Sequence, residues 1–286
     1  MSLILSLFLK QYWTYLNLRK EFINFEVMID DKAKRGIGSF THLIWVLAYK
    51  TLKLKYKNSV LGFFWSMLNP LMYLLIFTFV FSKVFGDIDR YPLYALTGIV
   101  FWSFFSTSTI QITESLIDNS GVLKSINVPT IAFPLSAQLA SLISLGFTLV
   151  PFTILMLLFG LELSWELIFF IPILLIFTGF TLGLSLILTS LNVYFRDMQL
   201  AWTSFLPAIF YSAPIAFTAD LIPDKYLLLL KMNPLYYYIN LLRDVVYHNR
   251  MPDGTNFLIG TVLAVVTFTI GFVVFRKLER GFVSQF

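Results

Sequence analysis

The feature that most constrains the fold of this chain is a long apolar stretch at residues 61–85, which follows directly on a basic segment. It contains one charged residue, Lys83. At about 1.5 Å rise per residue, a helix of this length crosses the roughly 30 Å hydrocarbon core of a bilayer. Pro70 lies inside the stretch, and in lipid such a proline is tolerated where neighbouring helices or side chains satisfy the freed carbonyl group. We therefore predict a kinked first membrane span inside a helix bundle.

Composition places the whole chain in the membrane class. Of its 286 residues, 58% are hydrophobic and 13% are charged, whereas a soluble domain carries about 25% charged residues. There is no cysteine, which excludes disulfides, iron–sulfur clusters and thiol nucleophiles. The two histidines, His42 and His248, lie far apart in the sequence, so we predict no metal site.

Five further apolar segments have the length of membrane spans. With the first span, they predict an all-α integral membrane protein with six transmembrane helices. The fifth segment contains Pro207 and Pro214, which we expect to kink one helix twice on the same face. The five segments are residues 93–113, 131–160, 167–190, 200–219 and 257–275.

Residues 1–60 predict a cytoplasmic N-terminal segment. Residues 1–18 predict a surface helix rather than a cleaved signal peptide, because no positive charge precedes the apolar part. Residues 40–57 predict an amphipathic helix in the membrane interface, with aromatic side chains on one face and lysines on another. The lysines expected to meet lipid phosphates are Lys50, Lys53 and Lys57.

Residues 220–255 do not predict a simple loop. Residues 226–232 are apolar but short, and Asn233 and Pro234 form a cap and first-position pair that opens a helix through about Val246. Neither piece is long enough to span a bilayer. Short apolar helices rich in tyrosine indicate re-entrant or interfacial structure before the last span.

The distribution of positive charge predicts the orientation. If the N-terminus is cytoplasmic, 15 of the 21 lysines and arginines lie in segments that face the cytoplasm. The positive-inside rule therefore places both termini in the cytoplasm and residues 220–255 outside.

From about residue 40 to its C-terminus, the chain resembles the membrane subunit of type-2 ABC exporters, most of all the branch that exports O-antigen, capsule and teichoic acid polysaccharides. The resemblance implies a six-helix type-2 ABC transmembrane domain over residues 61–286. The residues that carry it are Tyr56, Ser59, Leu61, Gly62, Trp65, Leu68, Pro70, the segments 84–86, 192–197 and 233–235, Arg243, and the tail 275–282.

The resemblance also implies partners. The chain contains no G-x-x-x-x-G-K-[ST] phosphate loop, so ATP and Mg²⁺ are expected on two separate ATP-binding cassette subunits, which dock on two copies of this chain. No cofactor is expected in the chain itself. The implied location is the inner (plasma) membrane of a bacterium, and the other expected partners are membrane lipids and a lipid-linked glycan, not nucleic acid. Coupling to the ATPase is implied for loop 114–130 and for Ser120, Gly121, Lys124, Arg196 and Asp197.

Aromatic residues make up 18% of the chain, and some of them are candidates for a passage. Flat, uncharged rings can contact sugar C–H faces without fixing them in place, as a sliding polymer requires. The candidate lining residues are Trp65, Phe101, Trp102, Phe104, Phe105, Phe210, Tyr211 and Phe217, and the candidate exit contacts are Tyr237 and Arg243.

Three other functions remain open at this point. The same permease could export teichoic acid, drugs or small lipids. A membrane-embedded glycosyltransferase would use acids such as Glu162, Glu166 or the Asp87 and Asp89 pair. Alanine at these acids would abolish an enzyme and leave an exporter working. A purely structural membrane subunit would have no ATPase partner.

Overall fold

The computed structural model describes residues 37–55, 90–125, 128–161, 164–218 and 222–285, with isolated positions between 68 and 80. Within these ranges, all regular secondary structure is helical. The predicted first span at residues 61–85 and the predicted surface helix at residues 1–18 lie outside the continuously described part. The helices are α2 (Ile37–Lys55), α4 (Tyr91–Asp118), α5 (Ser120–Ser125), α6 (Ala132–Leu158), η1 (Trp165–Phe169), α7 (Phe170–Tyr194), α8 (Met198–Tyr211), α9 (Asp224–Met232), α10 (Pro234–Val246), α11 (Gly254–Leu278), η3 (Glu279–Gly281) and α12 (Phe282–Gln285).

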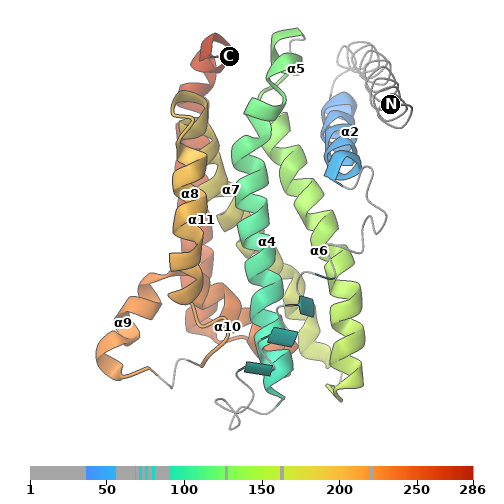
Figure 1. Ribbon diagram of the computed structural model, residues 1–286, viewed down its shortest axis with the longest axis vertical. Helices are drawn as coiled ribbons and strands as arrows, with labels where there is room; N and C mark the ends of the chain where they lie inside the picture. Colours follow the sequence, from blue (N-terminus) through green and yellow to red (C-terminus); the bar gives the residue numbers. More distant parts are fainter. Residues whose placement is uncertain are drawn as a thin grey trace, which may run out of the picture.

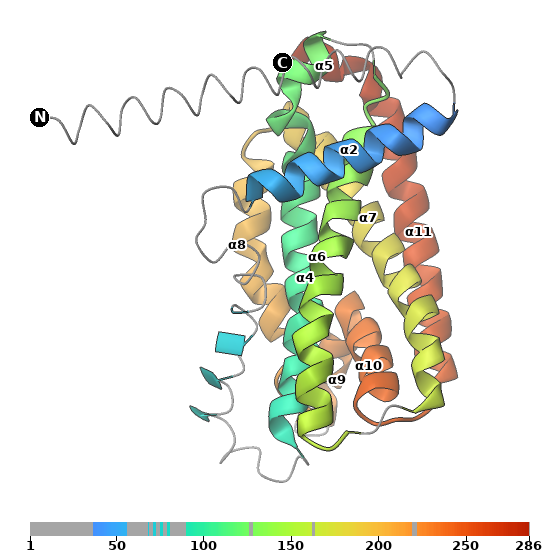
Figure 2. The ribbon, with the colours of Figure 1, turned by 90° about the vertical axis from the view of Figure 1, so that its right-hand side faces the viewer.

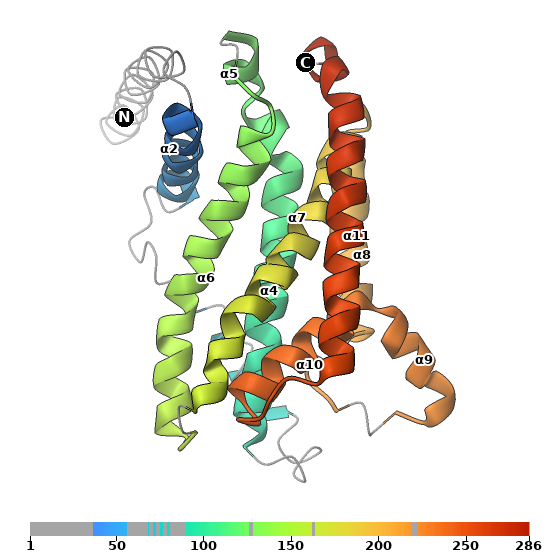
Figure 3. The same cartoon turned by 180° about the vertical axis from the view of Figure 1, so that it is seen from behind.

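Four helical stretches are long and apolar enough to cross a membrane: Tyr91–Ser125, Ala132–Leu158, Trp165–Tyr194 and Gly254–Gly281. They correspond to the second, third, fourth and sixth predicted spans. The long helices run side by side in a bundle (Figure 1), in which α4 packs against both α6 and α7. Seen from behind, α11 runs alongside α7 (Figure 3), and these two helices make the most extensive contact of any pair.

The α7–α11 contact depends on glycine. An added Cβ on Gly183 would lie 2.5 Å from the backbone nitrogen and Cα of Phe268, and one on Gly271 would approach the carbonyl oxygen of Gly183 to 2.0 Å. Small residues of this kind let two backbones approach closely. The two helices therefore cross with their main chains nearly in contact.

The fifth predicted span is shorter than the sequence indicates. Helix α8 ends at Tyr211, and its 14 residues are fewer than the roughly 20 that a membrane-spanning helix needs. Pro214, predicted as a second kink, lies beyond the helix in a non-helical segment at residues 212–218. Pro214 has no backbone N–H with which to continue the helix, and the carbonyl groups of this segment are bound by side chains from other helices, as described below.

Helix α4 is longer than predicted. It continues to Asp118, so that residues 114–118 of the predicted coupling loop are helical. At about 1.5 Å per residue its 28 residues extend roughly 42 Å, beyond the hydrocarbon core. Only the short helix α5 and the residues after it connect α4 to α6.

The two ends of the bundle differ in what they carry. Helix α5, the turn between α7 and α8, and the C-terminal residues lie at one end, while α9 and α10 lie toward the other (Figures 1 and 2). The predicted start of α10 is confirmed: the side chain of Asn233 accepts a hydrogen bond from the backbone of Leu235, and Pro234 is the first helical residue. Helix α9 projects sideways from the bundle. Whether α9 and α10 re-enter the membrane stays a prediction.

Helix α2 crosses the outside of the bundle at a steep angle and packs on α6 (Figure 2). Leu43, Leu47 and Ala48 are buried against the bundle, whereas Trp45 and Tyr49 are exposed. The exposed aromatic side chains face away from the protein, where an interface helix meets lipid headgroups.

Candidate functional site

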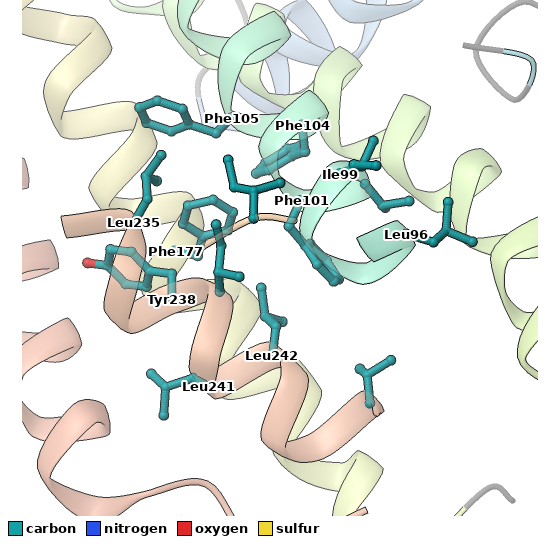
Figure 4. Packing of buried hydrophobic residues seen from close by; sticks show 14 of the residues in the cluster. Leu96, Ile99, Phe101, Phe104, Phe105, Phe177, Leu235, Tyr238, Leu241 and Leu242 are labelled. Atoms are coloured by element: carbon teal, nitrogen blue, oxygen red, sulfur yellow. The ribbon is translucent and has the colours of Figure 1, made fainter. Parts of the chain in front are cut away.

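Three of the aromatic residues predicted to line a passage are core residues. Phe101, Phe104 and Phe105 are at most 4% exposed. Phe104 and Phe105 pack against the ring of Phe177 (Figure 4), with centroids 5.7 and 6.2 Å apart, and Phe101 packs against Phe170 at 5.9 Å. In this single chain they fill the interior, so they do not present a surface to a substrate outside it.

The other aromatic candidates lie nearer the surface. Tyr211 is 75% exposed at the end of α8, and its ring packs edge-on against Phe210 at 5.1 Å. Phe210 in turn contacts Trp102 of α4 at 5.3 Å. Phe217 is partly buried in the segment after α8, and Trp65 lies outside the described residues. Of this set, a substrate or a second chain could reach Tyr211 most readily.

At the end of the bundle that carries α5, one of the lysines predicted to meet lipid makes a contact within the protein. The Lys50 ammonium donates a hydrogen bond to Asn119 Oδ1 at 3.1 Å, and Asn119 Nδ2 donates to the carbonyl oxygen of Ser115 at 2.8 Å. These contacts join α2 to the junction of α4 and α5. Lys53 is exposed, and Lys57 lies outside the described residues.

Replacing Lys50 with alanine is expected to lower the free energy of unfolding by about 1 kcal/mol, because one hydrogen bond to a half-exposed charged group is lost. Lys53→Ala is the matched control on the same helix and should change it less. Thermal unfolding of the detergent-solubilised protein, followed by tryptophan fluorescence, measures both. Equal effects of the two substitutions would contradict a specific contact between α2 and Asn119.

The residues predicted to couple to an ATPase lie at this same end. In α5, Val122 and Leu123 are buried in a cluster with Phe275 and Phe282, which fixes the orientation of the short helix. Most of the predicted coupling residues lie at the surface. Ser120 is partly buried, and Gly121, Lys124, Arg196 and Asp197 are exposed.

The side chain of a buried asparagine, Asn192, joins the turn that carries Arg196 and Asp197 to α4. Asn192 Nδ2 donates to the Thr113 carbonyl oxygen at 3.2 Å, and Asn192 Oδ1 accepts from the Gln199 backbone at 3.3 Å. The side-chain amide of Gln199 donates to the Glu114 carboxylate. Sequence reasoning missed this network, although Asn192 belongs to one of the segments that carry the family resemblance.

At the opposite end, Arg243 is 2% exposed and lies deep in the protein. Its guanidinium donates to the carbonyl oxygens of Pro214 and Ile215, and to the hydroxyl and carbonyl oxygens of Tyr94 at 2.7 and 3.3 Å. The guanidinium carbon also lies 3.6 Å from the centroid of the Tyr94 ring. In this conformation Arg243 binds the protein, and a contact between Arg243 and a substrate stays a prediction.

Two tyrosines of α4 extend this set of contacts. The hydroxyl of Tyr91 donates to the carbonyl oxygen of Ala216 at 3.0 Å, and that of Tyr94 donates to the carbonyl oxygen of Phe217 at 3.0 Å. With Arg243, they bind four consecutive carbonyl groups, from residue 214 to residue 217. We call Tyr91, Tyr94 and Arg243 the carbonyl cradle. The second exit candidate, Tyr237, is partly buried and packs against Tyr236 at 5.3 Å.

The described residues contain no group of three or more histidine or acidic side chains that could hold a metal ion. Of the acids that an enzyme would need, Glu166 is partly buried in η1, and Asp87, Asp89 and Glu162 lie outside the described residues.

The chain is similar to known transport proteins. Residues 42–247 match the family model described as ABC-2 type transporter. The chain is 30% identical over 256 residues to the O-antigen export system permease protein RfbA of Klebsiella pneumoniae, covering 88% of this chain and 97% of that one. It is 27% identical to RfbA of Myxococcus xanthus, covering 88% and 98%, and 22% identical to the polysialic acid transport protein KpsM of Escherichia coli, covering 88% and 100%.

Proposed function

Because this chain belongs to the ABC-2 type transporter family, we propose that it is the permease subunit of an ABC exporter that moves a lipid-linked polysaccharide out across the plasma membrane. The observation that carries the proposal is the match over 88% of this chain to permeases named for O-antigen export, at up to 30% identity. The match to a polysialic acid transport protein supports a polysaccharide as the cargo.

The energy for transport comes from a partner. Two ATP-binding cassette subunits, which hold ATP and Mg²⁺, dock on two copies of this chain at the end that carries α5 and the α7–α8 turn. Exposed Gly121, Lys124, Arg196 and Asp197 support this end as the docking surface. This end faces the cytoplasm together with both termini, which agrees with the positive-inside distribution of lysine and arginine.

The polymer passes along α8 in this proposal. Tyr211 offers an exposed ring with a polar tip, suited to weak, repeated contacts with sugar faces. Phe210 packs against Tyr211, Trp102 packs against Phe210, and Phe217 lies in the segment after α8. Tyr237 is the exit contact. At the cytoplasmic face, Lys53 and Lys57 meet the phosphates of the lipid carrier, while α9 and α10 lie on the outer side.

The test is the position of lipid-linked glycan after the protein is depleted in its host, probed from each side of the plasma membrane. We expect glycan to accumulate on the cytoplasmic face, because synthesis continues while export stops. A normal distribution would overturn the polysaccharide cargo and favour export of drugs or small lipids. Glycan that is never completed would overturn export and indicate a glycosyltransferase.

A further inference from the structure

The segment at residues 212–218 is non-helical, yet four of its carbonyl groups accept hydrogen bonds from side chains. A non-helical backbone leaves carbonyl groups without helical partners, and at membrane depth each unpaired group is costly. Here the carbonyl cradle binds residues 214–217. Asn233 Nδ2 adds hydrogen bonds to the Ile209 carbonyl oxygen at 3.1 Å and to Ser212 Oγ at 2.9 Å. The path of the chain after α8 is thereby fixed by α4 and α10.

Gly98 makes room for this arrangement. An added Cβ at this position would lie 2.4 Å from the Ile215 carbonyl oxygen and 2.7 Å from Nη2 of Arg243. Only glycine lets the segment and the guanidinium approach α4 so closely. The cradle therefore depends on the shape of α4 as well as on hydrogen bonds.

The chemistry of the cradle requires arginine. A planar guanidinium presents several donors in a rigid fork, whereas a lysine ammonium is a point charge on a flexible stem. None of the acceptors of Arg243 in the described ranges is a carboxylate; the adjacent Asp244 is engaged by Arg250, with Nη2 and Oδ1 2.6 Å apart. The guanidinium of Arg243 is surrounded by carbonyl dipoles, those of Pro214 and Ile215 after α8 and that of Tyr94 in α4.

We propose that Arg243 is a positioning residue for transport: together with Tyr91 and Tyr94 it holds residues 212–218 in one conformation and so fixes the end of α8, where Tyr211 is exposed. The first part of this proposal, the conformation of residues 212–218, does not depend on which cargo is exported. The second part, the effect on transport, rests on the proposed function.

The absence of cysteine from the chain allows a direct test of the position. Phe217→Cys, introduced into the otherwise cysteine-free protein in lipid nanodiscs, is reacted with a maleimide reagent. We expect Arg243→Lys to speed the labelling at least tenfold, because the released segment exposes the thiol. Arg250→Lys is the matched control: Arg250 is an exposed arginine paired with Asp244, and its substitution should leave the rate unchanged. An unchanged rate in Arg243→Lys would overturn the proposal.

The effect on transport is measured with the full exporter. We expect Arg243→Lys to lower polysaccharide export at least tenfold while the complex keeps most of its ATPase activity, a split that general misfolding would not give. Normal export by this variant would overturn the transport role. If Arg243→Lys does not accumulate, Tyr94→Phe replaces it, since it keeps the ring and loses the hydroxyl that contacts both Arg243 and Phe217. If labelling responds but the unaltered protein exports no polysaccharide, only the proposed cargo fails.

Discussion

Replacing Gly183 with leucine is expected to lower the amount of folded protein in the membrane several-fold. The first carbon of the new side chain would lie 2.5 Å from backbone atoms of Phe268, and backbone cannot rotate away as a flexible side chain can. Overpacking of this kind costs about 1–3 kcal/mol or more, roughly a 5- to 150-fold change in the ratio of folded to unfolded protein. Fluorescence-detected size exclusion of a tagged protein measures the folded fraction.

Gly179→Leu is the matched control for this prediction. Gly179 lies one turn earlier on α7, in the same Gly-x-x-x-Gly pattern, but an added Cβ there meets no atom within 4 Å. Its substitution should therefore leave the folded fraction nearly unchanged. Because leucine has a higher helix propensity than glycine, similar losses in both variants would show that the effect does not come from the crossing with α11.

Phe105→Ala is expected to destabilise the protein by about 3–5 kcal/mol, as truncation of a buried phenylalanine does in a packed interior. Phe105 is 1% exposed, and its ring contacts Phe177, Phe180 and Trp202 at 6.1–6.3 Å between centroids. A cavity would replace these contacts. Thermal unfolding of the purified protein, with and without the substitution, gives the loss.

Tyr211→Ala distinguishes the effect of losing a side chain in the proposed passage from the effect of losing a core side chain. Its side chain is exposed, so the substitution should lower stability by far less than Phe105→Ala, and in the proposed function it should slow export of long chains. If Phe105→Ala left the unfolding temperature unchanged and reduced export alone, the assignment of Phe105 to the core would be wrong.

The sequence was sufficient to predict those parts of the fold that depend on local patterns. Uninterrupted apolar stretches located four helices that the structure contains, because a helix buried in lipid needs length and hydrophobicity more than a specific partner. The start of α10 followed from Asn233 and Pro234, whose capping contacts are made within three residues. Such features need no knowledge of the rest of the chain.

Features that depend on distant contacts were missed. The carbonyl groups after α8 are bound by Arg243, which lies 29 positions from Pro214, and in the sequence Pro214 alone predicts a kink within a longer helix. The phenylalanines of α4 were indistinguishable in sequence from rings that face a passage; their burial depends on which neighbours α7 and α10 supply. Asn192 lies in a segment that carries the family resemblance, but its contacts could not be predicted, since its partners lie on α4 and at the start of α8.

Helix α8 is attached near both of its ends. The network of Asn192 and Gln199 joins its first turn to α7 and α4, and the carbonyl cradle joins the segment directly after its last residue to α4 and α10. A helix that is attached near both ends bends in its middle more easily than it tilts away from the bundle. Pro207 lies inside the helix, where the missing hydrogen bond lowers the resistance to bending. A passage bordered by α8 would thus change its width at mid-height while both mouths keep their diameter.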